Sequence, residues 1–430
     1  MRFGLYFPLQ LPRPWDARAE YRILDQALDQ VALADELGFD HAWAPEQHFT
    51  EEYSHSSAPE VFLAAASQRT HRIRLGHGVA LLPPGYNGPI RVAERTAALD
   101  LVSRGRAELG VGDSKSRLEL EGFGIDPQRR QEMTEEALRL VVRMWTETPF
   151  RGTDGVHARV PTRNVLPKPL QSPHPPLWMA CSDDAAIRRA ARLGIGVLTH
   201  AFYDVDEAAR TVELYHRTLA EECVPLSDAV NPRIAMMSPF YCHADAAEAV
   251  RVGRDAAGFL GYAVRHYYAF GRHLPGETDL WQRYEQVREG FGGAVPLRGG
   301  HAIGTPAEVR AYLEAYAEVG VDQVILAHQS GRLGHEEVCA SLRLFAAEVM
   351  PAMRASRTVA RQRLEALAPV VAAVRARRSA LPESVAVAPE PVDAYGRSRP
   401  APDLSALTPR ARDQVADLER MAAMARALED

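Results

Sequence analysis

Residues 44–60, "APEQHFTEEYSHSSAPE", gather groups that can hold or move protons directly after a short apolar run. Glutamate and histidine can act as general acids or bases, whereas a glutamine amide only donates or accepts hydrogen bonds. A polar surface loop would have a similar composition. The position of Glu46, Gln47 and His48 just past the expected strand 41–44 favours an active-site rim, because parallel barrels carry their substrate-facing side chains there.

Two glycines interrupt the apolar segment "LGHGVALLPP" (75–84). Glycine weakens a strand, so its presence there indicates either a bulge or the close approach of a ligand or another backbone. A flat ring lying against Gly76 and Gly78 would explain both glycines, and a bulge explains them nearly as well.

The segment 108–124, "ELGVGDSKSRLELEGFG", begins like a dinucleotide-binding fingerprint, but Lys115 stands where its third glycine is required. It also lacks the P-loop sequence, since Ser114 replaces the glycine that precedes the lysine. Both nucleotide motifs are therefore excluded. The remaining interpretation is a strand end whose glycines, Gly112 among them, allow a ligand to approach.

In "WMACSDDAAIRRAARLG" (178–194) an expected strand runs into a helix that begins near Ser182. Ser182 could be the N-cap, with Asp183 and Asp184 in the first turn where helices favour acids. Alternatively, the free N–H groups of that turn could bind a phosphate. Taken alone, the residues favour the cap, because two acids oppose a dianion.

Metal and disulfide chemistry have little support in the sequence. His41, His48 and His55 are evenly spaced, but neither HExxH nor another metal-binding spacing is present, and there is no GxSxG nucleophile motif. The cysteines are scattered without a CxxC pair, at positions 181, 223, 242 and 339. We therefore expect no metal centre and no disulfide framework.

The chain has 430 residues, 46% of them hydrophobic and 25% charged, which is ordinary for a globular protein. Its formal net charge of −6 argues against general binding to nucleic acids or anionic membranes, since both need a basic face. The N-terminus has no signal-peptide pattern, and no segment approaches the roughly 20 apolar residues of a membrane span. We expect a cytoplasmic protein.

Short apolar runs alternate with segments of helical periodicity along most of the chain. Eight strands, each followed by a helix, favour a parallel (β/α)8 TIM barrel, which is an α/β fold. A doubly wound Rossmann-like sheet would need a glycine-rich turn after the first strand, where "FPLQLPRPWD" supplies prolines instead. The strands are expected at 2–7, 41–44, 73–82, 106–112, 176–181, 195–199, 233–242 and 322–327.

Two insertions and a C-terminal extension do not fit the eight repeating units. Residues 149–175 are rich in proline and glycine with a β-like middle, which predicts a hairpin. Residues 273–303 are loop-like and glycine-rich, and we expect a lid or binding loop there.

The chain changes character after the barrel, which is expected to occupy residues 1–354. The extension, 355–430, combines a basic alanine-rich helix (355–379), a proline-rich linker (about 381–409) and a last helix (about 408–428). Packing of these helices on the same subunit is the simplest role for them.

Taken together, these segments resemble the bacterial luciferase-like flavin monooxygenase family over most of residues 2–354. Members of that family are (β/α)8 barrels that bind reduced flavin, or a deazaflavin, at the C-terminal mouth. Several motifs in the right order carry the resemblance: "LADELGFDHAWAPEQHFTE", "RIRLGHGVALLPP", "PIRVAERTAALDLVSRGRAELGVG", "EGFGID", "PHPPLWMACS", "IGTPAEV" and "GVDQVIL".

The resemblance assigns catalysis to Glu46, Gln47 and His48. Luciferase has two histidines after the glutamate, and Gln47 stands where the catalytic one is. Because glutamine cannot take up a proton near neutral pH, we expect a hydrogen-bonding role for Gln47 and prefer His48 as the catalytic residue.

The resemblance also implies a cofactor pocket. A non-prolyl cis peptide is expected at Gly78–Val79 beneath the flavin ring, and Ser182 matches a serine that binds the flavin phosphate, which outweighs the cap interpretation. Gly112 and Ala180 are expected in the same pocket.

The sequence departs from the family at other phosphate ligands. Cys181 and Ala185 replace the residues that flank the serine, and Asp113 replaces an arginine. Arg130 (or its neighbour at 129) is expected to survive as a phosphate ligand, with Lys115 as a compensating cation.

The implied function is a monooxygenase that uses reduced FMN (FMNH2) and O2, through a flavin hydroperoxide, to oxygenate a small organic substrate. A separate flavin reductase would supply the reduced flavin, and a homodimer is expected. One alternative is a deazaflavin-dependent oxidoreductase of the same superfamily, which transfers hydride. Another is a catalytically inactive flavin-binding barrel. The replacement of family residues by Gln47 and Asp113 supports this alternative.

Overall fold

The computed structural model describes residues 1–200, 204–297, 299–379 and 403–426. The chain divides into two compact units, Met1–Val387 and Ala388–Asp430. The first unit contains the whole barrel together with both insertions, and the second contains the last helix, α14 (Pro409–Arg426).

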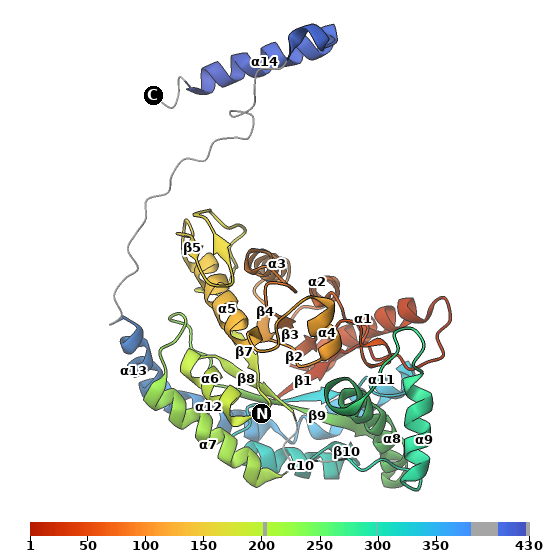
Figure 1. Cartoon of the computed structure of the whole chain (residues 1–430). Coiled ribbons are helices and arrows are strands. Elements are labelled where there is room, and N and C mark those ends of the chain that lie inside the picture. The colour runs from red at the N-terminus through yellow and green to blue at the C-terminus, as the bar shows by residue number, and fades with distance from the viewer. Residues whose placement is uncertain (201–203, 298, 380–402, 427–430) are drawn as a thin grey trace. The chain divides into compact units, whose positions relative to one another are not determined.

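Eight parallel strands close into a barrel in the first unit (Figure 1). Each strand pairs with the next around the ring, and β8 pairs with β9 to complete it. The (β/α)8 fold and all eight expected strands are confirmed, as β1 (Arg2–Tyr6), β2 (His41–Ala44), β3 (Arg74–Leu81), β4 (Ala107–Gly112), β7 (Leu177–Ala180), β8 (Gly196–Thr199), β9 (Ile234–Cys242) and β11 (Gln323–Ala327).

Helices surround this barrel, and local residue types mark several of their ends. Gly38 adopts a left-handed conformation (φ 89°) and ends α1, while Thr305 and Glu308 form a capping box at the start of α10. The helices are α1 (Ala19–Leu37), α2 (Pro59–Arg69), α3 (Pro89–Val102), α4 (Arg117–Gly122), α5 (Arg130–Thr146), α6 (Asp184–Leu193), α7 (Val205–Glu222), α8 (Ala246–Arg265), α9 (Leu280–Gly290), α10 (Pro306–Glu318), α11 (His335–Leu344), α12 (Arg354–Ala366) and α13 (Ala368–Ser379).

The flat ring that the strand glycines suggested belongs to the protein itself. A Cβ atom on Gly76 would overlap the indole of Trp43, and one on Gly78 would lie 3.1 Å from the Trp43 Cβ. The β3–β4 pairing also shifts register between His77 and Ala80. The irregularity of β3 supports the bulge interpretation, and the space beside Gly76 is taken by the Trp43 side chain, not by a ligand.

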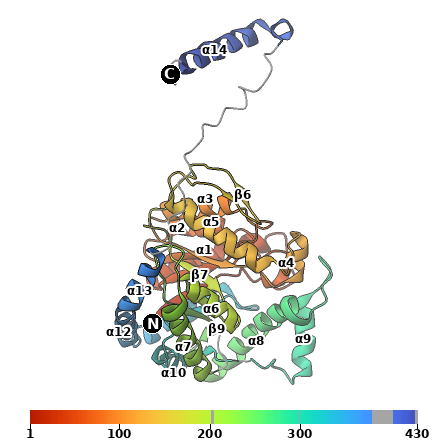
Figure 2. The same ribbon diagram turned by 60° about the vertical axis from the view of Figure 1, so that its left-hand side comes forward.

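The two insertions differ in how well the sequence predicted them. The expected hairpin within 149–175 is present as β5 (Thr153–Asp154) and β6 (Arg159–Val160), which pair antiparallel. Residues 273–303 are not merely a loop. They include α9, which lies beside α8 in Figures 1 and 2, and end with β10 (Ala302–Gly304), which pairs with β9.

The start of the C-terminal extension is part of the barrel unit. Arg357 on α12 donates a 2.8 Å bond to Asp40, and Val374 on α13 is fully buried. The expected helix 355–379 is present but divided between α12 and α13, and the barrel unit continues past 354 because both helices pack on it. The last helix is present as α14, whereas the expected linker falls mostly on residues 380–402, outside the described residues.

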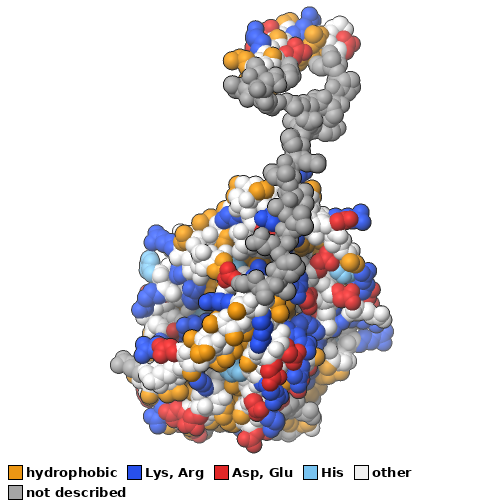
Figure 3. Space-filling model, turned by 90° about the vertical axis from the view of Figure 1, so that its left-hand side faces the viewer, with side chains coloured by type: hydrophobic (Ala, Val, Ile, Leu, Met, Phe, Trp, Pro, Cys, Tyr) orange, Lys and Arg blue, Asp and Glu red, His pale blue; other side chains and the backbone are white. Residues whose placement is uncertain are grey.

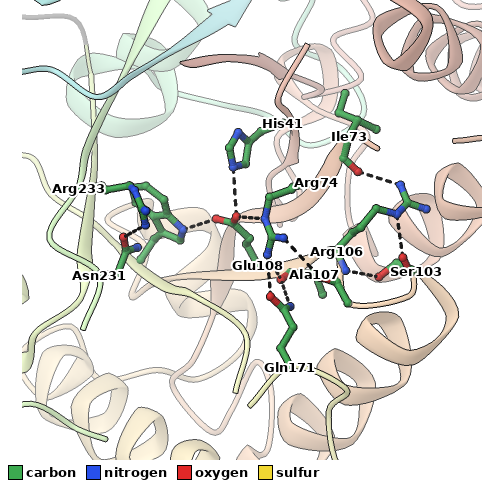
Figure 4. A network of polar contacts seen from close by, with 12 residues as sticks. His41, Ile73, Arg74, Ser103, Arg106, Ala107, Glu108, Gln171, Asn231 and Arg233 are labelled. Atoms are coloured by element: carbon green, nitrogen blue, oxygen red, sulfur yellow. Dashed lines mark hydrogen bonds and ion pairs between the residues drawn. The ribbon is translucent and has the colours of Figure 1, made fainter. Parts of the chain in front are cut away.

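A buried carboxylate connects neighbouring strands inside the barrel (Figure 4). Glu108 on β4 accepts from Trp178 Nε1 (2.6 Å), lies 3.1 Å from His41 Nε2 and forms an ion pair with Arg74. Burial alone would raise the pKa of Glu108, but His41 and Arg74 keep it well below its ordinary value. Strands β2, β3, β4 and β7 thus meet at one ionised group.

The outer surface in the space-filling view mixes charges of both signs (Figure 3). Pairs such as Arg192–Glu222 and Arg217–Glu213 account for part of this pattern on α6 and α7. Within the described residues, no helix is both long and apolar enough to cross a membrane.

Replacing Glu108 with Gln should lower the free energy of unfolding by about 3–5 kcal/mol, because Arg74 and His41 would lose their buried counter-charge. Urea unfolding followed by circular dichroism measures this loss. The control is Glu94→Gln, which breaks an exposed pair with Arg91 and should cost less than about 1 kcal/mol. Equal stability of the two variants would contradict the assigned role.

Glu108 should also make stability depend on pH. Because its pKa is lower in the folded state than the ordinary 4.5, Glu108 stabilises the fold above that pH, and this contribution disappears as the pH falls further. Urea midpoints measured on acidification should therefore fall more steeply for the native protein than for Glu108→Gln. Parallel curves would show that Glu108 does not carry this dependence.

Candidate active site at the mouth of the barrel

A cavity of about 360 Å³ lies at the carboxyl ends of the strands. All eight barrel strands contribute to its wall, which is how TIM barrels build active sites. The strand residues are Tyr6, Trp43, Gly78, Val79, Leu81, Gly112, Ala180, Leu198, Thr199, Met237 and Ile325.

Gln47 lines this cavity, directly past β2. Its Oε1 accepts a 2.8 Å hydrogen bond from Tyr268 Oη, which fixes the amide so that Nε2 is free to donate. Tyr268 also lines the cavity and lies in η2 (His266–Phe270), a π-helical turn at the end of α8. The sequence analysis missed Tyr268, because its distance from Gln47 along the chain gives no local signal.

His48 and Glu46 lie behind this wall, and neither is among the described residues that line the cavity. His48 Nε2 is 3.0 Å from Glu46 Oε1, and its ring packs against Phe123 with centroids 4.7 Å apart. His48, the preferred catalytic residue, therefore does not line this cavity, whereas Gln47 does. Side chains alternate in direction along an extended segment, and it is Gln47 that faces the cavity.

Glu46 connects the loop after β2 to β3. Its carboxylate accepts from the backbone N–H of Leu81 (2.8 Å) and from the Asn87 amide, and its own N–H donates to the carbonyl of Val79 (2.9 Å). Val79 follows a cis peptide bond, Gly78–Val79, at the position that the resemblance predicted. Glu46 and His48 thus position the wall rather than line it.

Gly112 allows Val79 to approach the neighbouring strand. A Cβ atom on Gly112 would lie 2.6 Å from Val79 Cγ2, so a larger residue would displace this part of the wall. Val79, Gly112 and Ala180, three of the residues expected to bind cofactor, are therefore together in the cavity lining.

Lys115 and Ser182 form the polar end of the cavity. Lys115 Nζ lies 2.5 Å from Ser182 Oγ and 3.5 Å from an oxygen of Asp183. The N-cap of α6 is Asp183, whose carboxylate accepts from the N–H of Ala186, and not Ser182. The Ser182 hydroxyl is therefore not used to cap the helix.

Arg130 is paired with another residue instead of lining the cavity. Its Nε lies 3.4 Å from Asp113 Oδ2, and its guanidinium also donates to the carbonyl of Pro127. Asp113, not Arg130, is among the lining residues. The expected role of Arg130 as a phosphate ligand therefore has no geometric support here, because the aspartate that replaces the family arginine binds it.

Glu119 on α4 is a second lining residue that the sequence analysis missed. It is 1% exposed and accepts hydrogen bonds from the N–H of His48 (2.8 Å) and from Ser114 Oγ (2.5 Å). Burial raises the pKa of Glu119. The sequence "RLELEG" gives no local signal for this burial, because residues adjacent in a helix do not share a face.

Glu51 and Glu52 attach the 273–303 insertion to the same loop as Gln47. Glu52 accepts from the backbone N–H groups of Leu280 (2.5 Å) and Trp281 (3.0 Å), at the start of α9. Glu51 accepts from the N–H of Gly276 (2.8 Å) and lies 3.1 Å from His273 Nε2.

Among the described residues, no group of three or more His, Cys, Asp or Glu side chains could hold a metal ion. The cavity combines aromatic and apolar side chains with the Lys115–Ser182 pair and the carboxyl groups of Asp113 and Glu119. It lies at the carboxyl ends of the barrel strands, where TIM-barrel enzymes have their active sites.

The chain belongs to the luciferase-like monooxygenase family, whose model matches residues 1–323. It is 26% identical over 368 residues to the oxygenase component of a flavin-dependent trigonelline monooxygenase from Acinetobacter baylyi, covering 83% of this chain and 97% of that one. The family expected from the sequence is confirmed, and with it the expected enzyme class, an oxidoreductase.

Two solved structures share the barrel fold. One is the oxygenating constituent of 3,6-diketocamphane monooxygenase from Pseudomonas putida in complex with FMN (TM-score 0.64, 21% identity, 82% of this chain and 98% of that one). The other is an F420-dependent secondary alcohol dehydrogenase with an F420–acetone adduct (TM-score 0.62, 20% identity, 82% and 99%). At these identities the likeness establishes the fold.

Replacing Glu52 with Ala should loosen the start of α9, because the N–H groups of Leu280 and Trp281 would lose their shared acceptor. Hydrogen exchange of α9 should become about tenfold faster or more, while exchange of the barrel strands should be unchanged. The control is Glu20→Ala, which removes an exposed partner of His55. Unchanged protection of α9 would show that Glu52 does not anchor it.

Proposed function

We propose that this chain is the oxygenase component of a two-component system that uses reduced FMN and O2 to oxygenate a small organic substrate. The observation that carries the proposal is the shape of one cavity. Its chamber is lined by Trp43, Val79 and other apolar residues, and it ends at the Lys115–Ser182 pair. A flat ring with an anionic tail matches both parts.

The residues present fit the FMN phosphate. Because Asp183 caps α6, the Ser182 hydroxyl can donate to a phosphate, and Lys115 supplies the charge. The negative charges of Asp183 and Asp113 disfavour an anion here. Lys115 would therefore have to leave its ion pair with Asp183 in order to bind the phosphate. When bound, reduced FMN would supply the reaction with O2 that places one oxygen atom in the substrate and releases the other as water.

In this proposal the residues of the chain bind and orient the ligands and shield the cavity from water. Gln47, fixed by Tyr268, donates a hydrogen bond at the chamber wall, and Glu46 and His48 are positioning residues behind it. The insertion anchored by Glu51 and Glu52 is the proposed lid that limits access of water.

A deazaflavin-dependent oxidoreductase that transfers hydride is the second candidate, favoured by the shared fold of the F420-dependent dehydrogenase. A separate flavin reductase is part of the main proposal. The words "oxygenase component" in the name of the Acinetobacter relative support it. A homodimer and a cytoplasmic location complete the proposal, as expected from the sequence.

Anaerobic titration with reduced FMN, followed by mixing with O2, tests the proposal. We expect saturable binding and, after mixing, an absorbing species that forms before oxidised FMN and outlives free-flavin oxidation. Lys115→Ala and Ser182→Ala should each weaken binding about 10–100-fold, as expected for charge-assisted hydrogen bonds. Arg130→Ala is the matched control and should change affinity by less than about threefold, because Asp113 occupies its guanidinium.

Other outcomes would redirect the assignment. Binding of reduced deazaflavin without binding of reduced FMN would support hydride transfer. Retained flavin binding without stimulated O2 consumption would indicate an inactive barrel. A larger effect of Arg130→Ala than of Lys115→Ala would contradict the assigned phosphate site.

A further inference from the structure

The chamber beyond the polar end carries almost no charge. Among the Asp, Glu, Lys, Arg and His residues of the described chain, only Asp113, Lys115, Glu119 and His200 line the cavity. Lys115 is already engaged with Ser182 and Asp183. Burial lowers the pKa of His200, which favours its neutral form.

Glu119 lines the cavity beside Ser114, the residue that precedes Lys115 in the chain. Both of its hydrogen-bond donors are uncharged, the N–H of His48 and the hydroxyl of Ser114. Burial is the main cause that raises the pKa of Glu119, while the His48 side chain lowers it and Glu46 raises it further. A second anion placed in the chamber would therefore meet a buried carboxyl group that forms no ion pair with a lysine or arginine of the described chain.

Hydroxyl and amide groups supply the remaining polarity of the chamber. Tyr6 and Tyr53 have their hydroxyl oxygens 3.5 Å apart, and both side chains line the cavity. Gln47 uses its Oε1 for Tyr268, and no hydrogen bond from its Nε2 to the described residues is present. The amide can thus donate to a neutral acceptor such as a carbonyl oxygen.

We propose that the substrate is an uncharged organic molecule with an apolar or aromatic body and a carbonyl-type acceptor that binds the Gln47 amide, and that Glu119 excludes carboxylate analogues. This proposal rests on the proposed function, since it assigns the substrate side of the same cavity. It makes Glu119 a specificity-determining residue.

The physical basis is a difference between two ligands of the same shape. A ketone places a neutral acceptor at Gln47, whereas a carboxylate adds a charge that either repels Glu119 or forces it to take up a proton. Either way the carboxylate loses affinity, and the ketone does not. Removing the charge of Glu119 should therefore raise the affinity for the carboxylate and leave the affinity for the ketone unchanged.

Anaerobic calorimetric titration of the full-length protein saturated with reduced FMN tests this with three matched pairs of increasing size. They are acetylcyclohexane and cyclohexanecarboxylate, acetophenone and benzoate, and 2-acetylnaphthalene and 2-naphthoate. We expect at least one ketone to bind, at least about tenfold more tightly than its carboxylate partner. Equal affinities within the pairs, or binding of no ketone, would overturn the proposal.

Two variants separate charge selection from a structural role. Glu119→Gln should raise carboxylate affinity about tenfold or more while leaving ketone affinity within about twofold, whereas general loosening would weaken both. Glu121→Gln on the same helix is the control, since Glu121 is exposed and pairs with Arg117. Gln47→Ala should weaken ketone binding about fivefold, as for one lost hydrogen bond. Parallel changes for ketone and carboxylate in Glu119→Gln would reject the assignment.

Binding of reduced FMN is measured first and separately. Its failure would count against the proposed function itself. Equal affinity for ketones and carboxylates in a protein that binds reduced FMN would overturn only the substrate assignment.

Discussion

The buried carboxylate of Glu108 is the constraint on which the barrel interior depends. A buried ionised group needs hydrogen-bond donors or opposite charges around it. His41, Arg74 and Trp178, on three other strands, provide these contacts to Glu108. The bond to Trp178 orients its indole, which packs edge-on against Trp43 with centroids 5.6 Å apart. Trp43 in turn lines the cavity and requires glycine at position 76. The position of Trp43 in the cavity wall thus depends, through Trp178, on the ionised Glu108.

Regular parts of the fold could be predicted because their signals are local. Apolar runs and helical periodicity located all eight barrel strands and the helices around them. The elements that were missed are short or depend on distant partners: α4 has six residues, and α9 begins where Glu52, far away in the chain, accepts its N–H groups. The packing of α12 and α13 on the barrel rests on contacts such as Arg357–Asp40, which no sequence window contains.

The site was predicted as a region more reliably than as a set of side chains. Motif position located the loop after β2 and the strand ends, but not which neighbour faces the ligand. Gln47 lines the cavity and His48 packs on Phe123, and that difference is one of side-chain direction. The N-cap of α6 is Asp183, which the sequence analysis had placed in the first turn of the helix, and composition alone does not distinguish these neighbouring positions. Tyr268 and Glu119 reach the cavity only because the barrel closes.

The loop after β2 joins two tasks in one short piece of backbone. Gln47 belongs to the chamber wall, while Glu51 and Glu52 bind the backbone of the 273–303 insertion. The Gln47–Tyr268 bond connects the same loop to η2, the turn that precedes the insertion in the chain. In the proposed enzyme, a movement of the insertion would thus be transmitted through Glu51 and Glu52 to the loop that carries the Gln47 amide.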